Sequence, residues 1–382
     1  MKKKTFESED LKKKVCVVVG TRPGIIKMSP IIKKAQESEY PSFVIHAGQH
    51  YSPSMDDQFF KDLDLKEPEY KLEHIKDCEL HGEQTAEMLK GIERILYEER
   101  PKVVLVCGDA NFNLAGALAA RKLHINLGHV ESGLRSDDWR MPEEHNRVMI
   151  DHISEFLFAP TKNTAQNAIE DNVKGNIFVT GNTIVDAVYE NEELAEEKSD
   201  ILETLGLKKK NYFVLTAHRE ENVDSKEKLE MISKFIKEMG DKYEGTPIIF
   251  PIHPRTKKRL KEFGMKEEFY SIDNLQVLEP LGYIDFLQLM NHAKLVLTDS
   301  GGIQEETCIL KTPCVTLREN TERPETVEVG SNIVTGLSIE DVLEGVREML
   351  GRKKDWKNPF GDGTASNQIM EVVKDCLEDR LS

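Results

Sequence analysis

The fold of this chain is decided by residues 295–306, which read Leu295-Val296-Leu297-Thr298-Asp299-Ser300-Gly301-Gly302-Ile303-Gln304-Glu305-Glu306. The apolar run at the start of this stretch predicts a short buried strand. The two glycines that follow let a backbone approach a ligand closely, and the next helix offers free N–H groups and the positive end of its dipole. The stretch therefore predicts a strand–loop–helix turn with a site for an anion.

The predicted helix opens with two acids, Glu305 and Glu306, and these allow two interpretations. Acids at a helix start commonly do no more than stabilise the helix dipole. Alternatively, one of them accepts hydrogen bonds from ribose hydroxyls while the loop N–H groups hold phosphates. Together with the charged run at 318–325, the second interpretation describes a pocket for a nucleotide diphosphate. That run reads Arg318-Glu319-Asn320-Thr321-Glu322-Arg323-Pro324-Glu325.

Outward from this turn, short β-branched runs alternate with longer amphipathic stretches along the chain. This alternation predicts an α/β fold of parallel sheets, with two Rossmann-like doubly wound domains that face each other across a cleft. We place the boundary in the acidic stretch 185–207, which gives an N-terminal domain at 1–185 and a C-terminal domain at 186–366 that contains the expected nucleotide-diphosphate pocket. The last helix, at 367–382, could belong to either domain, including by packing back on the first. The expected strands are 15–19, 43–47, 103–107, 126–130, 156–159 and 177–180, then 212–216, 247–252, 275–278, 295–298, 313–316 and 332–334.

Composition limits the class of protein. The chain has 382 residues and a formal net charge of −16, which argues against nucleic acid as a partner because a phosphate backbone demands a basic face. No stretch approaches the roughly 20 apolar residues of a membrane span, and the charged start at 1–14 has no apolar signal region. The 6 cysteines show no paired motif and no zinc spacing. We therefore expect a cytoplasmic protein without membrane association, structural metal or disulfides.

A basic turn follows the first expected strand and places Arg22 and Lys27 near the start of a helix. An anion is favoured at such a helix start. The turn matches neither the GxGxxG dinucleotide fingerprint nor the Walker A motif. A basic surface turn without a ligand is the alternative.

Acids and a histidine follow other expected strands, where doubly wound sheets bind ligands. Asp109 is either a helix N-cap or a carboxylate in the cleft. Glu131 and Glu143 belong to a dense set of charges that forms either a solvated loop or a proton-transfer site. Two carboxylates in one pocket push one pKa upward, which suits proton transfer near neutral pH. His218 could bridge phosphate oxygens or stabilise a leaving group, or it could be structural.

Nine motifs, taken in order, resemble the non-hydrolysing UDP-N-acetylglucosamine 2-epimerase family from about residue 15 to residue 336. They are GTRP…IK, GQH, GD, HVESGLR, PEEHNR, TGNTIVDA, AHREEN, DSGGIQEE and TERPE. The resemblance implies a GT-B-like fold with the active site in the cleft between two Rossmann-type domains. It also implies reversible conversion of UDP-GlcNAc to UDP-ManNAc at C2 without cofactor or metal. We expect these two sugars and UDP as ligands, and a homodimer.

The resemblance also assigns roles to single residues. The catalytic positions correspond to Asp109, Glu131, Glu143 and His218. The substrate-binding positions correspond to Arg22, Lys27, Phe286, Ser300, Gly301, Gly302, Glu306 and Arg323, with Phe286 near the uracil. An allosteric site for a second UDP-GlcNAc, as in bacterial members, would use Gln49, Arg219 and His253. The match there is incomplete, because Tyr51 and Ser52 stand where those members often carry Arg and a polar residue.

The mechanism that the resemblance implies begins with loss of UDP from C1. The C2 proton of a sugar is not acidic, but an oxocarbenium ion developing at C1 acidifies it. Elimination gives a 2-acetamidoglucal, and readdition with a proton on the other face inverts C2, so two proton-transfer groups are needed. A GT-B glycosyltransferase, a hydrolysing epimerase and a non-catalytic nucleotide-sugar sensor are the alternatives. The set Asp109, Glu131 and Glu143 disfavours the transferase and the sensor, since neither needs three carboxylates.

Overall fold

The computed structural model describes residues 6–48, 59–73, 75, 78 and 80–381, which form two α/β units. The first unit contains Met1–Tyr189 and Phe360–Ser382, and the second contains Glu190–Pro359. The chain leaves the first unit inside helix α7 (Thr183–Lys198) and returns to it for its last helix, α17 (Ala365–Leu377). These limits differ by several residues from the boundaries expected from the sequence.

The first unit is built on a parallel sheet of seven strands in the order β3-β2-β1-β4-β5-β6-β7. Strand β1 pairs with both β2 and β4, so the chain builds outward to one edge and then starts again on the other side of β1. Such a reversal is the switch point at which doubly wound sheets bind ligands. The strands are β1 (Lys12–Val19), β2 (Ser42–His46), β3 (Tyr70–Lys71), β4 (Pro101–Cys107), β5 (Asn126–Val130), β6 (Phe156–Ala159) and β7 (Asn176–Val179).

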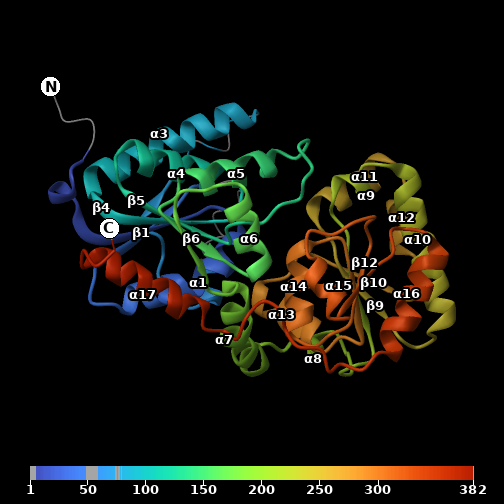
Figure 1. The fold of residues 1–382 in the computed structure, drawn as a ribbon. Coiled ribbons are helices and arrows are strands. Elements are labelled where there is room, and N and C mark those ends of the chain that lie inside the picture. Colours follow the sequence, from blue (N-terminus) through green and yellow to red (C-terminus); the bar gives the residue numbers. More distant parts are fainter. Residues whose placement is uncertain (1–5, 49–58, 74, 76–77, 79, 382) are drawn as a thin grey trace. The chain divides into compact units, whose positions relative to one another are not determined.

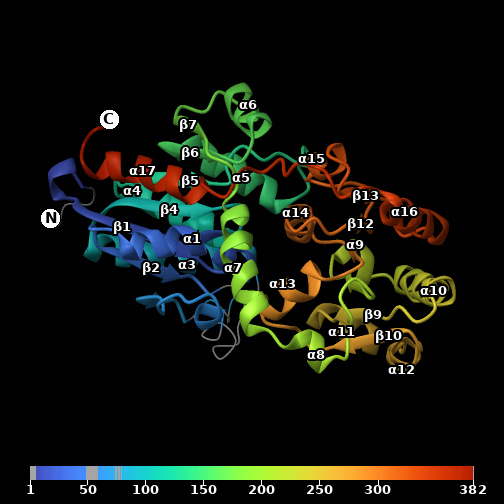
Figure 2. The same cartoon turned by 90° about the horizontal axis from the view of Figure 1, so that it is seen from below.

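Helices cover both faces of this sheet. Figure 1 shows α3, α4 and α5 over one face and α1 and α17 over the other. Figure 2 also places α17 alongside α1, although the two helices come from opposite ends of the chain. Cover on both faces explains why the middle strands are continuous apolar runs without alternation. The helices are η1 (Ser8–Asp10), α1 (Arg22–Glu37), α3 (His81–Glu99), α4 (Asn111–Lys122), α5 (Pro142–Ile153) and α6 (Lys162–Glu170), besides α7 and α17.

The second unit has a parallel sheet of six strands in the order β10-β9-β8-β11-β12-β13, with its reversal between β8 and β11. Buried apolar side chains of the sheet pack with those of α10 and α16 in one core. The strands are β8 (Phe213–Thr216), β9 (Ile248–Pro251), β10 (Leu275–Leu278), β11 (Leu295–Thr298), β12 (Cys314–Thr316) and β13 (Asn332–Val334). The helices are α8 (Ile201–Thr204), α9 (Glu220–Val223), α10 (Lys226–Lys242), α11 (Pro254–Glu262), α12 (Lys266–Tyr270), α13 (Tyr283–Asn291), α14 (Gly301–Ile309), α15 (Pro324–Glu328) and α16 (Ile339–Gly351).

The twelve strands expected from the sequence all form, and the two parallel sheets confirm the predicted α/β class. The sequence does not predict β3, because this edge strand consists of only two residues, Tyr70 and Lys71. Within the described ranges, none of the helices combines the length and the apolar character needed to cross a membrane.

Candidate active site

The carboxyl ends of β4 and β5 hold two of the predicted catalytic carboxylates. These strands pair as far as Cys107 and Val130, so Asp109 and Glu131 follow neighbouring strand ends. Glu131 is 8% exposed and has a left-handed backbone with a φ of +66°. Its carboxylate accepts a short hydrogen bond from the ammonium group of Lys27, which lies on α1. The predicted proton-transfer residue Glu131 is therefore a buried carboxylate beside a cation.

Gly108 brings the β4 turn close to Glu131. Its φ is +75°, in the left-handed region that favours glycine, and an added Cβ would lie 3.4 Å from Glu131 Oε2. A side chain at this position would strain the turn and lie against the carboxylate. Glycine therefore lets the backbone before Asp109 pass next to Glu131.

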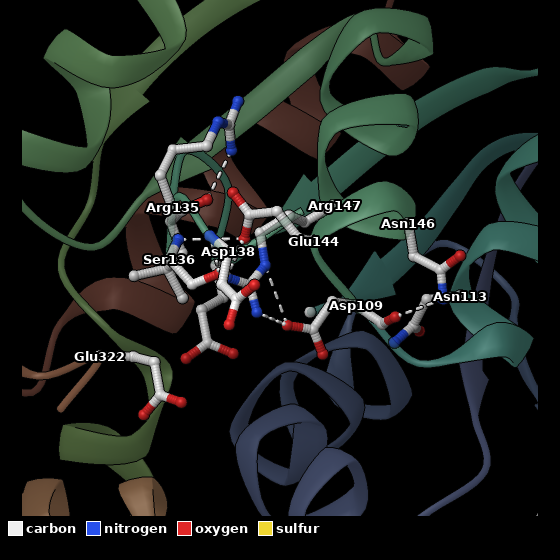
Figure 3. Close-up of polar contacts among 12 residues, drawn as sticks. Asp109, Asn113, Arg135, Ser136, Asp138, Glu144, Asn146, Arg147 and Glu322 are labelled. Atoms are coloured by element: carbon white, nitrogen blue, oxygen red, sulfur yellow. Dashed lines mark hydrogen bonds and ion pairs between the residues drawn. The ribbon is translucent and has the colours of Figure 1, made fainter. Parts of the chain in front are cut away.

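Helix α5 holds Asp109 in place. Arg147 Nε lies 3.1 Å from Asp109 Oδ2, and Arg147 Nη2 contacts the same oxygen. The same guanidinium places Nη1 2.7 Å from Glu144 Oε2, and Figure 3 shows it between the two carboxylates. Asn146 Nδ2 donates to the carbonyl oxygen of Asp109 at 2.8 Å. Residues of α5 thus fix both the side chain and the backbone of Asp109.

Glu143 and Glu144 are neighbours on α5 with different surroundings. Glu144 is 2% exposed and accepts hydrogen bonds from the Ser136 hydroxyl at 2.7 Å and the Ser136 N–H at 3.0 Å. Glu143 lies exposed in the first turn of the helix. Among the residues that the structure describes, no hydrogen bond or ion pair joins Glu143 to Glu131. The structure thus gives no direct contact for the predicted sharing of one pocket.

A buried charge cluster lies next to these strand ends, and the sequence did not predict it. His129 Nδ1 lies 2.6 Å from Asp151 Oδ1, and both side chains are fully buried. Asp151 Oδ2 accepts the Gly133 N–H at 3.1 Å and lies 2.8 Å from Arg135 Nη1. Burial by itself raises the pKa of Asp151, but the His129 and Arg135 contacts outweigh it, so the pKa lies below its ordinary value.

A second histidine–carboxylate pair lies at the switch point of the second sheet. His218 follows β8, and its Nδ1 lies 3.0 Å from Asp299 Oδ1. Asp299 follows β11, is fully buried, and also accepts the backbone N–H groups of His218 and Arg219 at 2.9 Å. Burial by itself raises the pKa of Asp299, but the His218 contact and these N–H groups lower it by more. The pKa therefore lies below its ordinary value. Asp299 thereby holds both the ring of His218 and the turn that carries it.

Helix α14 begins beside this pair. Ser300 is its N-cap residue, and the Ser300 N–H donates to Thr298 Oγ1 at 3.0 Å. A Cβ added to Gly302 would meet no heavy atom within 4 Å, so the backbone borders open space there. The start of this 9-residue helix therefore has the N–H groups and the room that a phosphate needs.

The two acids of α14 are both buried, unlike surface acids that only stabilise a dipole. Glu305 is 1% exposed and lies 2.6 Å from Arg323 Nε. Glu306 is 6% exposed, and the pKa of Tyr283 is raised by burial and then by the negative charge of Glu306. Arg323, a predicted UDP ligand, is thus anchored to the helix that would bind the phosphates.

A further arginine stabilises the loop before Arg323. Arg318 is 6% exposed and places Nη1 2.7 Å from Glu322 Oε2 and Nε 2.8 Å from Glu221 Oε1. Burial raises the pKa of Glu322, but Arg318 more than reverses this and lowers the pKa to about 2.

The remaining predicted residues lie at separate places. Arg22 lies in the first turn of α1, with its guanidinium 5.8 Å from the centre of the Phe59 ring. Phe286 is a half-buried residue of α13. The His253 ring centre lies 5.2 Å from that of His218, which is next to Arg219. The predicted residue Gln49 lies outside the described residues.

Sequence reasoning missed the residues that hold others in place, namely Asp151, Asp299, Arg147 and Glu144. Asp299 could have been predicted as a residue of the site, because it stands between a buried strand and the two glycines of the predicted anion-binding turn. The other three lie on α5, where helical spacing alone does not show which side chains turn toward the sheet. Within the described part of the chain, no group of three or more His, Cys, Asp or Glu residues is arranged to hold a metal ion.

Comparison with known proteins agrees with this arrangement. The profile of one family, described as UDP-N-acetylglucosamine 2-epimerase, matches residues 33–374. The chain is 50% identical over 363 residues to the UDP-N-acetylglucosamine 2-epimerase of Methanocaldococcus jannaschii, covering 94% of this chain and 98% of that one. It is 36% identical over 366 residues to the UDP-2,3-diacetamido-2,3-dideoxy-D-glucuronate 2-epimerase of Pseudomonas aeruginosa, covering 94% and 99%.

A solved structure extends the match to three dimensions. The crystal structure of the M. jannaschii UDP-GlcNAc 2-epimerase in complex with UDP-GlcNAc and UDP has a TM-score of 0.87 and covers 94% of this chain and 99% of that chain. The fold is therefore GT-B-like, and the protein is an enzyme of the UDP-N-acetylglucosamine 2-epimerase class. The chain belongs to the non-hydrolysing UDP-N-acetylglucosamine 2-epimerase family.

Proposed function

We propose that this enzyme interconverts UDP-GlcNAc and UDP-ManNAc by inverting C2 of the sugar. The observation that carries the proposal is the set of groups at the strand ends of this family member: the half-buried Asp109 after β4, the buried Glu131 after β5, and a helix start with two glycines after β11. The two carboxylates suit proton transfer at a sugar carbon, and the helix start suits a diphosphate.

The reaction starts with cleavage of the C1–O bond, and UDP departs with the bonding electrons. The oxocarbenium ion that develops acidifies the C2–H bond, and a base removes that proton to give 2-acetamidoglucal. Readdition of UDP at C1, with a proton delivered to the opposite face of C2, gives the epimer. No electrons are gained or lost overall, so the scheme requires acid–base groups and a diphosphate site only.

The proton-transfer groups are Asp109, Glu131 and Glu143. Lys27 contacts Glu131 and Arg147 contacts Asp109, so each of these two carboxylates has a cation beside it. Asp109 and Glu131 follow adjacent strands and are held by different partners, as two groups that serve different faces of one carbon need to be. Glu143 is exposed in this structure, so its part requires a change of surroundings when substrate binds.

The departing diphosphate is stabilised by positive charge and N–H groups. Ser300, Gly301 and Gly302 supply the helix start, and His218 supplies a ring nitrogen, since Asp299 occupies its Nδ1. The other predicted substrate ligands are Arg22, Lys27, Phe286, Glu306 and Arg323. For Lys27 this role competes with its contact to Glu131, and a phosphate would have to share or replace that carboxylate.

Incubation with UDP-GlcNAc in D2O, followed by proton NMR, tests the reaction. Deuterium should appear at C2 of both epimers without added nicotinamide, and free UDP should not accumulate. Retention of the original C2 proton would contradict elimination, and accumulating UDP with free ManNAc would identify a hydrolysing enzyme. UDP-2,3-diacetamido-2,3-dideoxy-D-glucuronate in a parallel reaction tests whether this chain prefers the other substrate class.

Substitutions test the assignment of roles. Asp109→Asn, Glu131→Gln and Glu143→Gln should each lower kcat by roughly 10²–10⁴-fold while the Kd for UDP changes little. Arg323→Ala and Glu306→Ala should instead weaken UDP binding. Acid variants that lose UDP affinity and keep kcat would show that the roles are reversed.

We further propose that a second UDP-GlcNAc activates the enzyme through Gln49, Arg219 and His253. Activation predicts a lag in the reaction from UDP-ManNAc that trace UDP-GlcNAc abolishes, and Gln49→Ala should remove this response. Hyperbolic kinetics that do not change on addition of UDP-GlcNAc would count against the second site.

We also propose that the enzyme works as a cytoplasmic homodimer. Light scattering coupled to size-exclusion chromatography measures the oligomeric state.

A further inference from the structure

The two ring nitrogens of His129 both face groups that accept hydrogen bonds. Nδ1 lies 2.6 Å from Asp151 Oδ1, and Nε2 lies 3.1 Å from the carbonyl oxygen of Gly108. A carbonyl oxygen can only accept, so Nε2 must carry a proton. An ionised carboxylate can also only accept, so Nδ1 carries a second proton whenever Asp151 is charged.

The surroundings of Asp151 favour its charged form. Its Oδ2 accepts the Gly133 N–H at 3.1 Å and lies 2.8 Å from the Arg135 guanidinium. A backbone donor and a guanidinium both stabilise a negative charge on this carboxylate, independently of His129. Arg135 in turn lies 2.7 Å from Asp171 on its other side. With His129 protonated, the cluster contains two cations, His129 and Arg135, and two anions, the buried Asp151 and the exposed Asp171.

We propose that His129 is a fixed imidazolium that acts as a positioning residue for the two proton-transfer carboxylates. It bridges helix α5, through Asp151, to the end of β4, through Gly108. The inference rests on the proposed function only in taking Asp109 and Glu131 as the reacting groups. Asp109 directly follows Gly108, and Glu131 stands two residues after His129. The bridge therefore sets the distance between the two strand ends that carry these acids.

The backbone at these ends explains why a bridge is needed. Glu131 and Gly108 both have left-handed φ values, +66° and +75°, and a non-glycine residue in that region is strained. The Gly108 N–H donates to the Val130 carbonyl oxygen at 3.0 Å, which completes the strand pairing on the other side of the turn. The contact from His129 Nε2 to the Gly108 carbonyl oxygen adds a second link between the two turns.

The protonation state can be measured without any assay of activity. Long-range ¹H–¹⁵N correlation spectra of the resting enzyme at pH 7 should show His129 with both ring nitrogens protonated and similar in shift. The chain has 11 histidines, and loss of one pattern in His129→Gln assigns the signal. Two well-separated nitrogen shifts, typical of a neutral ring, would overturn the inference even if the enzyme epimerises UDP-GlcNAc as proposed.

Two substitutions separate the two halves of the bridge. In His129→Gln the amide nitrogen takes the place of Nε2 and can donate to Gly108, whereas in His129→Asn it takes the place of Nδ1 and can reach only Asp151. If the Gly108 contact positions the acids, the Gln variant should keep kcat within about tenfold and the Asn variant should lose about 10²-fold. KM and the Kd for UDP should stay unchanged in both, which a general loss of structure would not produce.

Equal kcat losses in two folded variants would overturn the positioning role. Thermal unfolding of both variants, with the exposed neighbour His152→Asn as control, shows whether they are folded. If the Asn variant does not fold, the Gln variant decides, since a 10²-fold loss of kcat there contradicts the inference and near-normal kcat supports it. If no variant and no wild-type enzyme epimerises any substrate, the proposed function fails while the NMR result still decides the charge on His129.

Discussion

Each unit of this enzyme contains a histidine held by a buried aspartate, and the two pairs differ in what remains of the ring. In the first unit, His129 is fully buried and both of its ring nitrogens have partners. In the second unit, Asp299 holds Nδ1 of His218, but the His218 side chain is 33% exposed. The same two residue types therefore differ in exposure: both nitrogens of His129 are bound within the protein, whereas His218 keeps an exposed part of its ring, as the proposed contact with the departing diphosphate requires.

The aspartates also differ in what they organise. Asp151 accepts hydrogen bonds within a cluster of side-chain charges that ties helix α5 to the sheet. Asp299 accepts backbone N–H groups of the turn after β8, together with Asn222 Nδ2 at 3.2 Å. The two aspartates are thus alike in burial but bind different donors, and the exposure of the ring is what distinguishes His218 from His129.

The largest expected effect concerns the exposed ring. In His218→Asn the amide nitrogen can still donate to Asp299, but the nitrogen assigned to the departing diphosphate is lost. We expect kcat to fall by roughly 10²–10⁴-fold, the usual worth of a positioned polar group. The melting temperature should stay close to that of wild type, since Asp299 keeps its other donors. His292→Asn, which alters an ion pair with Glu196 elsewhere in the second unit, is the control. A folded His218→Asn enzyme with normal kcat would remove the distinction between the two histidines.

Asp299→Asn should have the next largest effect, on both activity and stability. The amide keeps one oxygen, which can still accept the backbone N–H groups and Asn222 at the place of Oδ2, but it loses the charge and the acceptor Oδ1 that faces His218 Nδ1. Hydrogen bonds to charged groups contribute about 1.5–3 kcal/mol each, and we expect a loss of stability of that order. Because His218 also loses its orienting charge, kcat should fall by about 10–10²-fold. Urea unfolding followed by fluorescence of buried Trp356 measures the first effect in this unit. An unchanged urea midpoint would show that Asp299 is not what holds the turn.

Asp151→Asn should change the acid stability of the first unit. The pKa of Asp151 is lowered from its ordinary value of 3.8, so its charge stabilises the fold above about pH 4 and this contribution is lost as the pH falls through the lowered value. The variant lacks the contribution at neutral pH, so its unfolding free energy should depend less steeply on pH between about 5 and 3. Urea unfolding of both proteins by circular dichroism across this range gives the two slopes. Parallel slopes would indicate that Asp151 is not charged in the folded protein, contrary to the lowered pKa that it shares with Asp299.

The smallest effect is expected where the partner of the acid is an arginine in place of a histidine, and where the acid is only half-buried. Glu322 beside Arg318 has a pKa of about 2, lowered from 4.5, so its contribution is present above about pH 4.5 and is lost toward pH 2. Glu322→Gln should cost about 1–2 kcal/mol at neutral pH, less than the full pKa shift implies, because the loop can adjust. Trp356 fluorescence during urea unfolding at pH 7 and pH 4 measures it. A larger loss than that of Asp299→Asn would show that the ion pair, not the histidine pair, dominates this unit.

The order of elements was within reach of the sequence because each strand is a local apolar run. Residues 126–130, 275–278, 295–298 and 332–334 were expected as strands and form β5, β10, β11 and β13 with those limits. Such runs are recognisable since both faces of each sheet are covered, which removes the need for alternation. The short edge strand β3 has no such signal, because its two residues form a strand only by pairing with β2.

The sequence by itself determined the α/β class and the strand–loop–helix turn at 298–302. It also determined that Asp109, Glu131 and His218 lie at strand ends. Strand, turn and helix signals all act over a few neighbouring residues, which is why these features could be predicted. Only the tertiary structure decided the partners: Lys27 meets Glu131, Arg147 meets Asp109, and Asp151 meets His129. Each of these contacts joins a helix to the end of a strand, so it depends on how the helix is turned and placed on the sheet. That placement is set by packing of the whole core, which no short stretch of sequence contains.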